Sequence, residues 1–288
     1  SFRKSGGLRE KHRPGRAALQ LQYVKLRASR RGPSLFPMTR SKDNAPKGYG
    51  QFCPIALAAE IMAERWTPLV LRGLFCGARR FNEIQESVPR MSSSLLSRRL
   101  KELERANIIA RTPDAQGRGA TYRLTRAGEE IFPVLDSMGN WAQKWLRREI
   151  TRDENLDPDV LMWELRQTIL KQGEPVAGRR VVQFRLDGVP VAKRFYWLVF
   201  EGGPAGLADV DICVQDPGHE VDLWVQGTLK TLVEIWLGHL PLKQAVEAGR
   251  LQLDGPKKEI AAFARWYGLS HFAAEGLRLT ARGPEARG

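Results

Sequence analysis

The alternation of apolar and polar residues becomes regular from Cys53 onward and predicts a run of helices there. Pro54 is typical of a helix start, because its missing N–H costs nothing at the first helical position. Thr67 is predicted to cap a second helix, which Gly77 ends. Arg79 to Phe81 is a candidate for a very short strand. The helices are predicted over residues 54–64, 67–76 and 82–87.

Residues 92–106 form the most regular amphipathic segment of the chain. Leu96, Leu100 and Leu103 recur at the spacing of one helix face, which predicts a buried stripe, and Ser92 is a candidate cap. The opposite face is polar and holds Ser94, Ser97, Arg98, Lys101 and Arg105. This helix therefore turns one face to a core and presents the other to solvent or to a partner.

Two short strands and a long helical stretch follow. Gly117 and Gly119 lie in a turn-forming segment between strands predicted over 108–112 and 121–125. Residues 126–148 read as a helix that Pro133 kinks or divides. This stretch carries more apolar surface than a small domain can cover, and with residues 54–64 it is predicted to form a homodimer interface.

The second half of the chain mixes helices with alternating strands after a polar linker over 151–158. Helices are predicted over 159–170, 228–237, 241–248 and 257–266, and strands over 181–186, 194–200, 210–214, 221–225 and 250–253. The predicted fold class is α+β, with a mainly helical N-terminal half that ends in a β-hairpin and an α+β C-terminal half. The predicted boundaries are a basic disordered arm (1–48), a first domain (49–150), a second domain (159–275) and a disordered tail (276–288).

Met38 stands just before the region where the pattern begins, and we expect it to be the natural start of the protein. Residues 1–37 would then be upstream sequence. The alternative is a native basic arm that adds nonspecific phosphate contacts.

Charge is unevenly distributed along the chain. The net charge is +14, and residues 38–150 carry 19 basic against 12 acidic residues, whereas 151–288 carry 17 against 19. A basic first half beside a near-neutral second half indicates that the first half meets a polyanion, although a merely soluble basic surface would show the same count.

Several classes of protein are disfavoured by what the sequence lacks. The three cysteines and four histidines do not have the spacing of metal ligands, so no metal is expected. The sequence also shows no paired nucleophile and base and no phosphate-binding loop, so neither another cofactor nor enzymatic activity is expected. No stretch is long and apolar enough for a membrane helix. The absence of a disulfide pattern favours the cytoplasm.

A helix, a short helix, an amphipathic helix and a hairpin follow the order of a winged helix-turn-helix, which reads double-stranded DNA by placing one helix in the major groove. The predicted base-reading residues are Ser93, Ser94, Ser97 and Arg98. The predicted phosphate and wing contacts are Arg99, Lys101, Arg105 and Arg118. A solvated helix face is the simpler explanation of the same charges.

Three segments resemble the HxlR-type winged-helix regulators: CPIALAAEIMAERWTPLVLRGL, GARRFNEIQESVPRMSSSLLSRRLKELERANII and TYRLTRAGEEIFPVLDSMGNW. The resemblance covers about residues 53–145 and implies a homodimer that presents two recognition helices. Ser93 and Ser94 depart from the family, where Pro and Lys are frequent. In several such regulators the cysteine of the Cys-Pro motif senses oxidants or electrophiles, which makes Cys53 a candidate sensor. Cys-Pro is otherwise only a structural feature of the family.

The run EVDLWVQGTLKTLVEIWLGHLPLKQAVEAGRLQLDGPKKEIAAF resembles the sterol-carrier-protein-like fold, over about residues 160–272. Such domains enclose an apolar tunnel, so a pocket lined by Phe195, Trp197, Leu232 and Trp236 is predicted, with a solid core as the alternative. The predicted function is a sequence-specific, homodimeric transcriptional regulator, a repressor or an activator, acting on a pseudo-palindromic operator and modulated by an apolar small molecule. The alternatives are an apolar-ligand carrier with an accessory nucleic-acid-binding half, and a redox regulator acting through Cys53.

Overall fold

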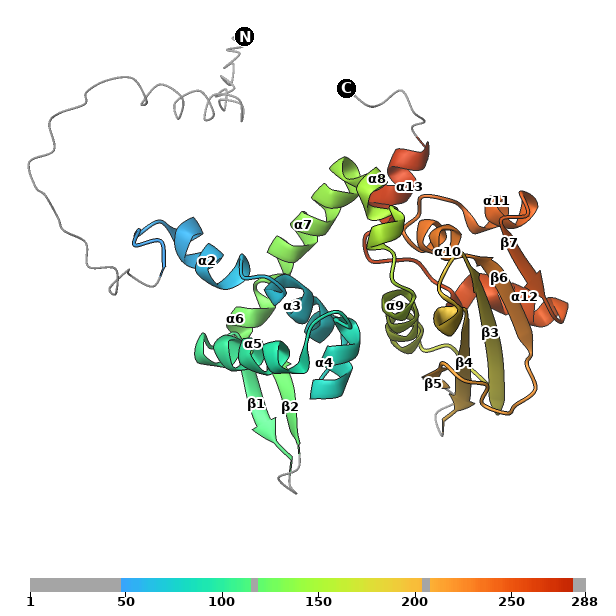
Figure 1. Cartoon of the computed structure of the whole chain (residues 1–288), viewed down its shortest axis with the longest axis horizontal. Helices are drawn as coiled ribbons and strands as arrows, with labels where there is room; N and C mark the ends of the chain where they lie inside the picture. Colours follow the sequence, from blue (N-terminus) through green and yellow to red (C-terminus); the bar gives the residue numbers. More distant parts are fainter. Residues whose placement is uncertain (1–47, 115–118, 204–207, 282–288) are drawn as a thin grey trace, which may run out of the picture. The chain divides into compact units, whose positions relative to one another are not determined.

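The computed structural model describes residues 48–114, 119–203 and 208–281, and mixes helices with strands (Figure 1). The arm predicted over 1–48, with Met38, lies outside the described residues except for its last position. In the N-terminal part the elements are α2 (Pro54–Met62), α3 (Thr67–Cys76), α4 (Phe81–Ser87), α5 (Ser93–Arg105), β1 (Ile109–Pro113), β2 (Ala120–Leu124), α6 (Arg126–Glu129), α7 (Phe132–Trp145) and α8 (Arg147–Ile150).

The helix ends follow local chemistry in most places. Ser92 caps α5 and accepts a hydrogen bond from the Leu95 backbone N–H at 3.3 Å. Pro133 lies in the first turn of α7, so the predicted long helix is divided there as expected, between α6 and α7, and a second break that was not predicted separates α7 from α8. Thr67 was predicted to be a cap, but it is the first residue of α3. The cap position belongs to Trp66, which adopts a left-handed conformation with φ 78°.

One hydrophobic core holds α3, α4 and α5 against the β1–β2 hairpin. The predicted leucine stripe of α5, namely Leu96, Leu100 and Leu103, is fully buried in it. Arg80 adds a single bridge to Thr121, so the short strand predicted near residue 80 is present as an isolated bridge beside β2. The remaining buried members include Val70, Leu71, Leu74, Ile84, Ile108 and Ile109.

The C-terminal part is built on a five-stranded sheet with the order β5-β4-β3-β6-β7 (Figure 1). The pair β3–β6 is parallel and the other neighbouring pairs are antiparallel. The elements are η2 (Asp153–Asn155), α9 (Pro158–Gln172), β3 (Arg179–Asp187), η3 (Val191–Lys193), β4 (Phe195–Gly202), β5 (Ala208–Cys213), β6 (Leu223–Thr228), α10 (Leu229–Trp236), α11 (Leu242–Glu247), β7 (Leu251–Asp254), α12 (Lys257–Trp266) and α13 (Ala273–Ala281). Helix α13 corrects the sequence prediction, because a disordered tail was expected from residue 276.

The sheet carries its main core on one face. Tyr196, Leu198 and Phe200 of β4 lie in that core together with residues of α9, α10 and α12. Trp197 and Val199 point to the other face, where they form a smaller cluster with Val181. Helices thus cover one side of the sheet with a large apolar core, while the other side keeps a small one.

Helix α9 belongs to both parts of the described chain. Leu161, Met162 and Leu165 pack in the core of the sheet, whereas the neighbouring Trp163 is 1 % exposed and packs in the core of the N-terminal helices. Helix α9, which follows the predicted linker, therefore contributes to both cores and joins the two halves.

Candidate nucleic-acid interface

The first turns of α5 present a polar face to solvent. Ser93, Ser94, Ser97 and Arg98 are all exposed, because the leucine stripe of the same helix is directed into the core. The Arg98 side chain is 67 % exposed and its Nε lies 3.8 Å from Glu102 Oε1. An exposed ion pair of this kind is weak, so Arg98 can leave Glu102 to contact a DNA base. These four residues are brought together on one accessible surface, and base reading remains a prediction for them.

Arg99 does not belong to this surface. It was predicted to contact phosphate, but it is 6 % exposed and its guanidinium lies 2.6 Å from Glu102 Oε2 and 3.0 Å from Glu64 Oε2. Arg99 therefore ties α5 to the segment between α2 and α3. Lys101 and Arg105 are exposed on α5, as a phosphate contact requires.

The hairpin supplies two basic residues that the sequence reasoning missed. Arg111 on β1 and Arg123 on β2 are exposed, and the register places Arg111 opposite Tyr122 and Arg123 opposite Ala110. Strand alternation puts the two arginines on opposite faces of the wing. An arginine in each predicted strand was the available signal. Arg118 lies outside the described residues.

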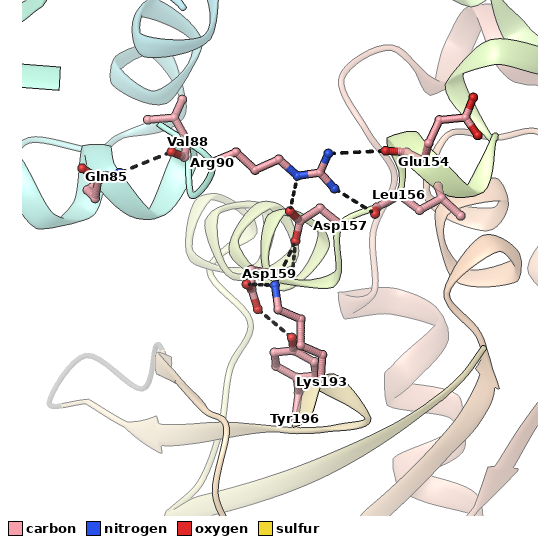
Figure 2. Close-up of polar contacts among 9 residues, drawn as sticks. All are labelled: Gln85, Val88, Arg90, Glu154, Leu156, Asp157, Asp159, Lys193 and Tyr196. Atoms are coloured by element: carbon pink, nitrogen blue, oxygen red, sulfur yellow. Dashed lines mark hydrogen bonds and ion pairs between the residues drawn. The ribbon is translucent and has the colours of Figure 1, made fainter. Parts of the chain in front are cut away.

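The turn that leads into α5 is fixed to the start of α9 (Figure 2). Arg90 Nε donates to Asp157 Oδ2 at 3.1 Å, and its two terminal nitrogens donate to the backbone oxygens of Glu154 at 3.3 Å and Leu156 at 3.5 Å. Asp157 also caps α9 through the Asp159 backbone N–H at 3.1 Å. The position of α5 is thus tied to an element of the C-terminal part.

The same acidic cluster continues to the sheet (Figure 2). Lys193 Nζ lies 2.6 Å from Asp159 and 3.7 Å from Asp157, and the Tyr196 hydroxyl donates to Asp159 at 2.6 Å. The hydrogen bond to Asp159 raises the pKa of Lys193, and burial raises the pKa of Tyr196. The lysine stays charged and the phenol stays neutral at physiological pH. The two aspartates are therefore paired with the lysine cation, and Asp159 also accepts a hydrogen bond from the phenol O–H.

The predicted ligand pocket does not assemble. Phe195 is 39 % exposed and Trp197 lies in the small cluster on one face of the sheet, whereas Leu232 is fully buried in the main core on the other face. The pleat of β4 directs Phe195 and Trp197 away from α10. Trp236, half-buried on α10, does line a cavity, but with partners that the sequence did not indicate.

The three cysteines are free thiols in different settings. Cys53 stands at the N-cap of α2 and is half-buried. Burial raises the pKa of Cys76 to about 11, and burial also raises that of Cys213. Cys76 is thus a neutral thiol at physiological pH, which leaves Cys53 as the candidate for thiol chemistry.

Among the described residues, no group of three or more histidine, cysteine or acidic side chains could hold a metal ion. No helix in the same part of the chain has the length and apolar character needed to cross a membrane.

A recognition-type helix with an exposed polar face beside a β-hairpin defines a winged helix-turn-helix protein. Residues 61–150 match the HxlR-like helix-turn-helix family. The HTH-type transcriptional regulator YvaP of Bacillus subtilis is 35 % identical over 99 residues, which cover 33 % of this chain and 91 % of YvaP. The regulator sll1512 of Synechocystis is 38 % identical over 102 residues, covering 35 % and 75 % of the two chains. The chain belongs to the HxlR-like family of DNA-binding transcriptional regulators.

Another similar chain is YodB of Bacillus subtilis, an HTH-type transcriptional regulator that is 34 % identical over 96 residues, covering 32 % of this chain and 85 % of YodB. A structure of its reduced form covers 33 % of this chain and 95 % of YodB, with 33 % identity and a TM-score of 0.30.

Proposed function

We propose that the protein is a homodimeric regulator that binds a pseudo-palindromic operator, with one copy of α5 in each of two major-groove half-sites. The observation that carries this proposal is the division of α5 into a buried leucine stripe and an exposed face of Ser93, Ser94, Ser97 and Arg98. Arginine can contact guanine through two hydrogen bonds, and serine hydroxyls accept or donate with less selectivity. Lys101, Arg105 and the wing arginines supply phosphate contacts.

The dimer part of the proposal rests on apolar surface that one chain leaves uncovered. On α7, Val134, Met138, Trp141 and Trp145 follow helical spacing and are each more than half exposed. Helix α2 contains no buried residue although most of its residues are apolar, and Ile55 is 79 % exposed. Contiguous apolar surface of this kind marks an interface, and a second copy of the chain supplies a self-complementary partner.

We infer a regulatory role for the C-terminal part, for which we propose the sterol-carrier-like fold on the resemblance of its sequence. The order of β6, α10, α11, β7 and α12 agrees with the run of sequence on which that resemblance rests. Residues 151–288 are close to neutral in net charge, so this part adds little to DNA affinity and is expected to have another role. We propose that this part makes operator binding responsive to an apolar small molecule.

The test is selection of binding sites from random DNA, followed by titration of the purified full chain at several salt concentrations. We expect a two-fold symmetric site and a log–log slope of affinity against salt of about −5 or steeper. Equal affinity for the selected site and for random competitor DNA would contradict the proposal. That result would favour a ligand carrier whose basic half binds nucleic acid without sequence preference.

A further inference from the structure

A cavity of about 720 Å³ lies where the N-terminal helices meet the C-terminal part. Phe75 of α3 and Phe132 of α7 contribute to one wall, Val160 of α9 and Trp236 of α10 to another, and Phe272 comes from the segment before α13. Its volume is within the range of small-molecule sites, and its walls are mainly apolar. The cavity is thus shared by the DNA-binding family region and the part that follows it.

Two buried hydrogen-bond donors on residues that line the cavity lack an acceptor among the described residues. They are Gln143 Nε2 and Trp236 Nε1, both of them buried atoms. Gln143 is 2 % exposed, and its other amide atom, Oε1, lies 2.6 Å from His239 Nε2. A buried donor without an acceptor destabilises the folded protein, because the donor has lost its hydrogen bond to water. A ligand that carries an acceptor oxygen would offset that destabilisation.

The cavity wall is also connected to the DNA-binding elements. Arg72 on α3 lines the cavity, lies 3.4 Å from Glu164 of α9, and donates to the Ser87 backbone oxygen at the end of α4 at 2.8 Å. The ring centroids of Phe75 and Phe132 lie 5.0 Å apart, which joins α3 to α7 at the same wall. A molecule in the cavity would therefore touch α3, which belongs to the core of the DNA-binding elements, and α7, which carries the apolar stripe of the proposed dimer interface.

We propose that this cavity is the effector site of the regulator, and that it takes a mainly apolar molecule bearing a carbonyl or carboxylate oxygen, which accepts hydrogen bonds from Gln143 and Trp236. This assignment replaces the pocket predicted around Phe195 and Trp197. The regulatory consequence rests on the proposed function, whereas ligand binding does not depend on it. An effector changes operator affinity only by as much as it distinguishes the bound and free arrangements of the dimer.

The experiment titrates the full chain with three naphthalene derivatives of similar size: 2-acetonaphthone, 2-naphthoate and 2-ethylnaphthalene. Calorimetry should give one site per chain. At least one of the two oxygen-bearing compounds should bind about tenfold more tightly than 2-ethylnaphthalene, which has no acceptor. Their relative affinities tell a neutral carbonyl effector from a carboxylate. Equal affinity of all three compounds, or no binding by any of them, would overturn the proposal.

Variants locate the site. Val160→Trp places a large ring in the cavity and should weaken binding by about tenfold or more, whereas Val191→Trp, at a position 75 % exposed on η3, should leave it unchanged. Trp236→Phe keeps a ring but removes one of the two donors, and should reduce the preference for an acceptor by about threefold. If Val160→Trp does not fold, Trp236→Phe still decides the question. Unchanged preference in Trp236→Phe would exclude the assigned donor.

The two proposals fail separately. Titration of the selected operator with and without the bound compound measures the coupling, and we expect a change of about fivefold or more. Ligand binding with no change in operator affinity would refute the effector role while leaving the DNA-binding proposal intact. Ligand binding by a chain that shows no operator preference would retain the cavity assignment and refute the proposed function.

Discussion

Arg90 and Asp157 are 67 positions apart in the chain, yet the Arg90 guanidinium donates to the Asp157 carboxylate at 3.1 Å. Arg90 immediately precedes the segment that enters α5, and Asp157 caps α9. The two differ in exposure, with 59 % of the Arg90 side chain and 11 % of the Asp157 side chain accessible. The pair therefore joins an exposed arginine of the DNA-binding region to a nearly buried carboxylate.

Removal of the two partners should have unequal effects. Arg90→Ala loses an ion pair that is largely in water, and should lower the free energy of unfolding by about 0.5–1 kcal/mol. Asp157→Ala also loses the cap of α9 and a contact with Lys193, and should lower it by about 1–3 kcal/mol. Chemical denaturation of both variants checks this order. Equal effects would show that the cap and Lys193 contribute nothing.

Arg98 and Arg99 are adjacent in sequence but should behave differently. Arg98→Ala should lower affinity for the selected operator by about 1–3 kcal/mol, lower affinity for random DNA by less, and leave stability unchanged. Arg99→Ala should lower the free energy of unfolding by about 1–3 kcal/mol, because it removes a buried guanidinium that pairs with Glu64 and Glu102. Equal loss of affinity of Arg98→Ala on both DNAs would reduce Arg98 to a phosphate contact.

The pattern of apolar residues was sufficient to predict most helices and strands, because each element buries one face. It also contained information on Arg99 that was not used. Arg99 follows Leu96 by three positions and precedes Leu103 by four, so helical spacing places it beside the buried stripe. A charged residue at such a position is expected to have a partner, and here the partners are Glu64 and Glu102.

The ligand site could not be predicted in the same way. Alternation along β4 separates Phe195 and Trp197 from Tyr196 and Leu198, but it does not reveal which set faces the helices. That choice depends on the sheet order β5-β4-β3-β6-β7 and on where α10 packs, which are long-range properties. The cavity next to Trp236 depends on contacts between helices far apart in sequence, so local patterns carry no signal for it.

Trp141 provides a direct test of the proposed dimer interface. Trp141→Glu places a charge within the exposed apolar stripe of α7, and should raise the dimer dissociation constant by about thirtyfold, the effect of losing a residue that contributes about 2 kcal/mol. Trp224→Glu is the matched control, because Trp224 is 44 % exposed on β6 and outside the stripe. Light scattering at micromolar concentration checks both. A dimer unaffected by Trp141→Glu would place the interface elsewhere.

Sensitivity of operator binding to oxidants should depend on Cys53. We expect treatment with a thiol oxidant to weaken operator binding by the wild-type chain and to leave Cys53→Ser unaffected. Cys76→Ser is the control and should respond like the wild type, since burial keeps the pKa of Cys76 at about 11 and its thiol neutral. Gel-shift titration before and after treatment measures the effect. Wild-type binding that resists the oxidant would leave Cys53 with a structural role.

His239 gives the stability of the protein a dependence on mildly acidic pH. Burial, reinforced by the positive charge of Arg147, lowers the pKa of His239 to about 4 from its ordinary value of 6.5. The unfolded chain therefore binds a proton as pH falls through about 6.5, and the folded chain does so only near pH 4. The free energy of unfolding should decline between these two values, by at most about 1.4 kcal/mol per pH unit from this group.

The variant His239→Gln isolates this contribution. Glutamine retains a donor for Gln143 but does not titrate, so the difference between wild-type and variant unfolding free energies should change with pH between about 6.5 and 4 and be constant above. Burial raises the pKa of Glu164, which contributes with the opposite sign as pH falls, but that contribution is common to both chains and cancels in the difference. Urea denaturation at half-unit pH steps provides the measurement. A constant difference across the whole range would mean that His239 is protonated equally in the folded and unfolded states.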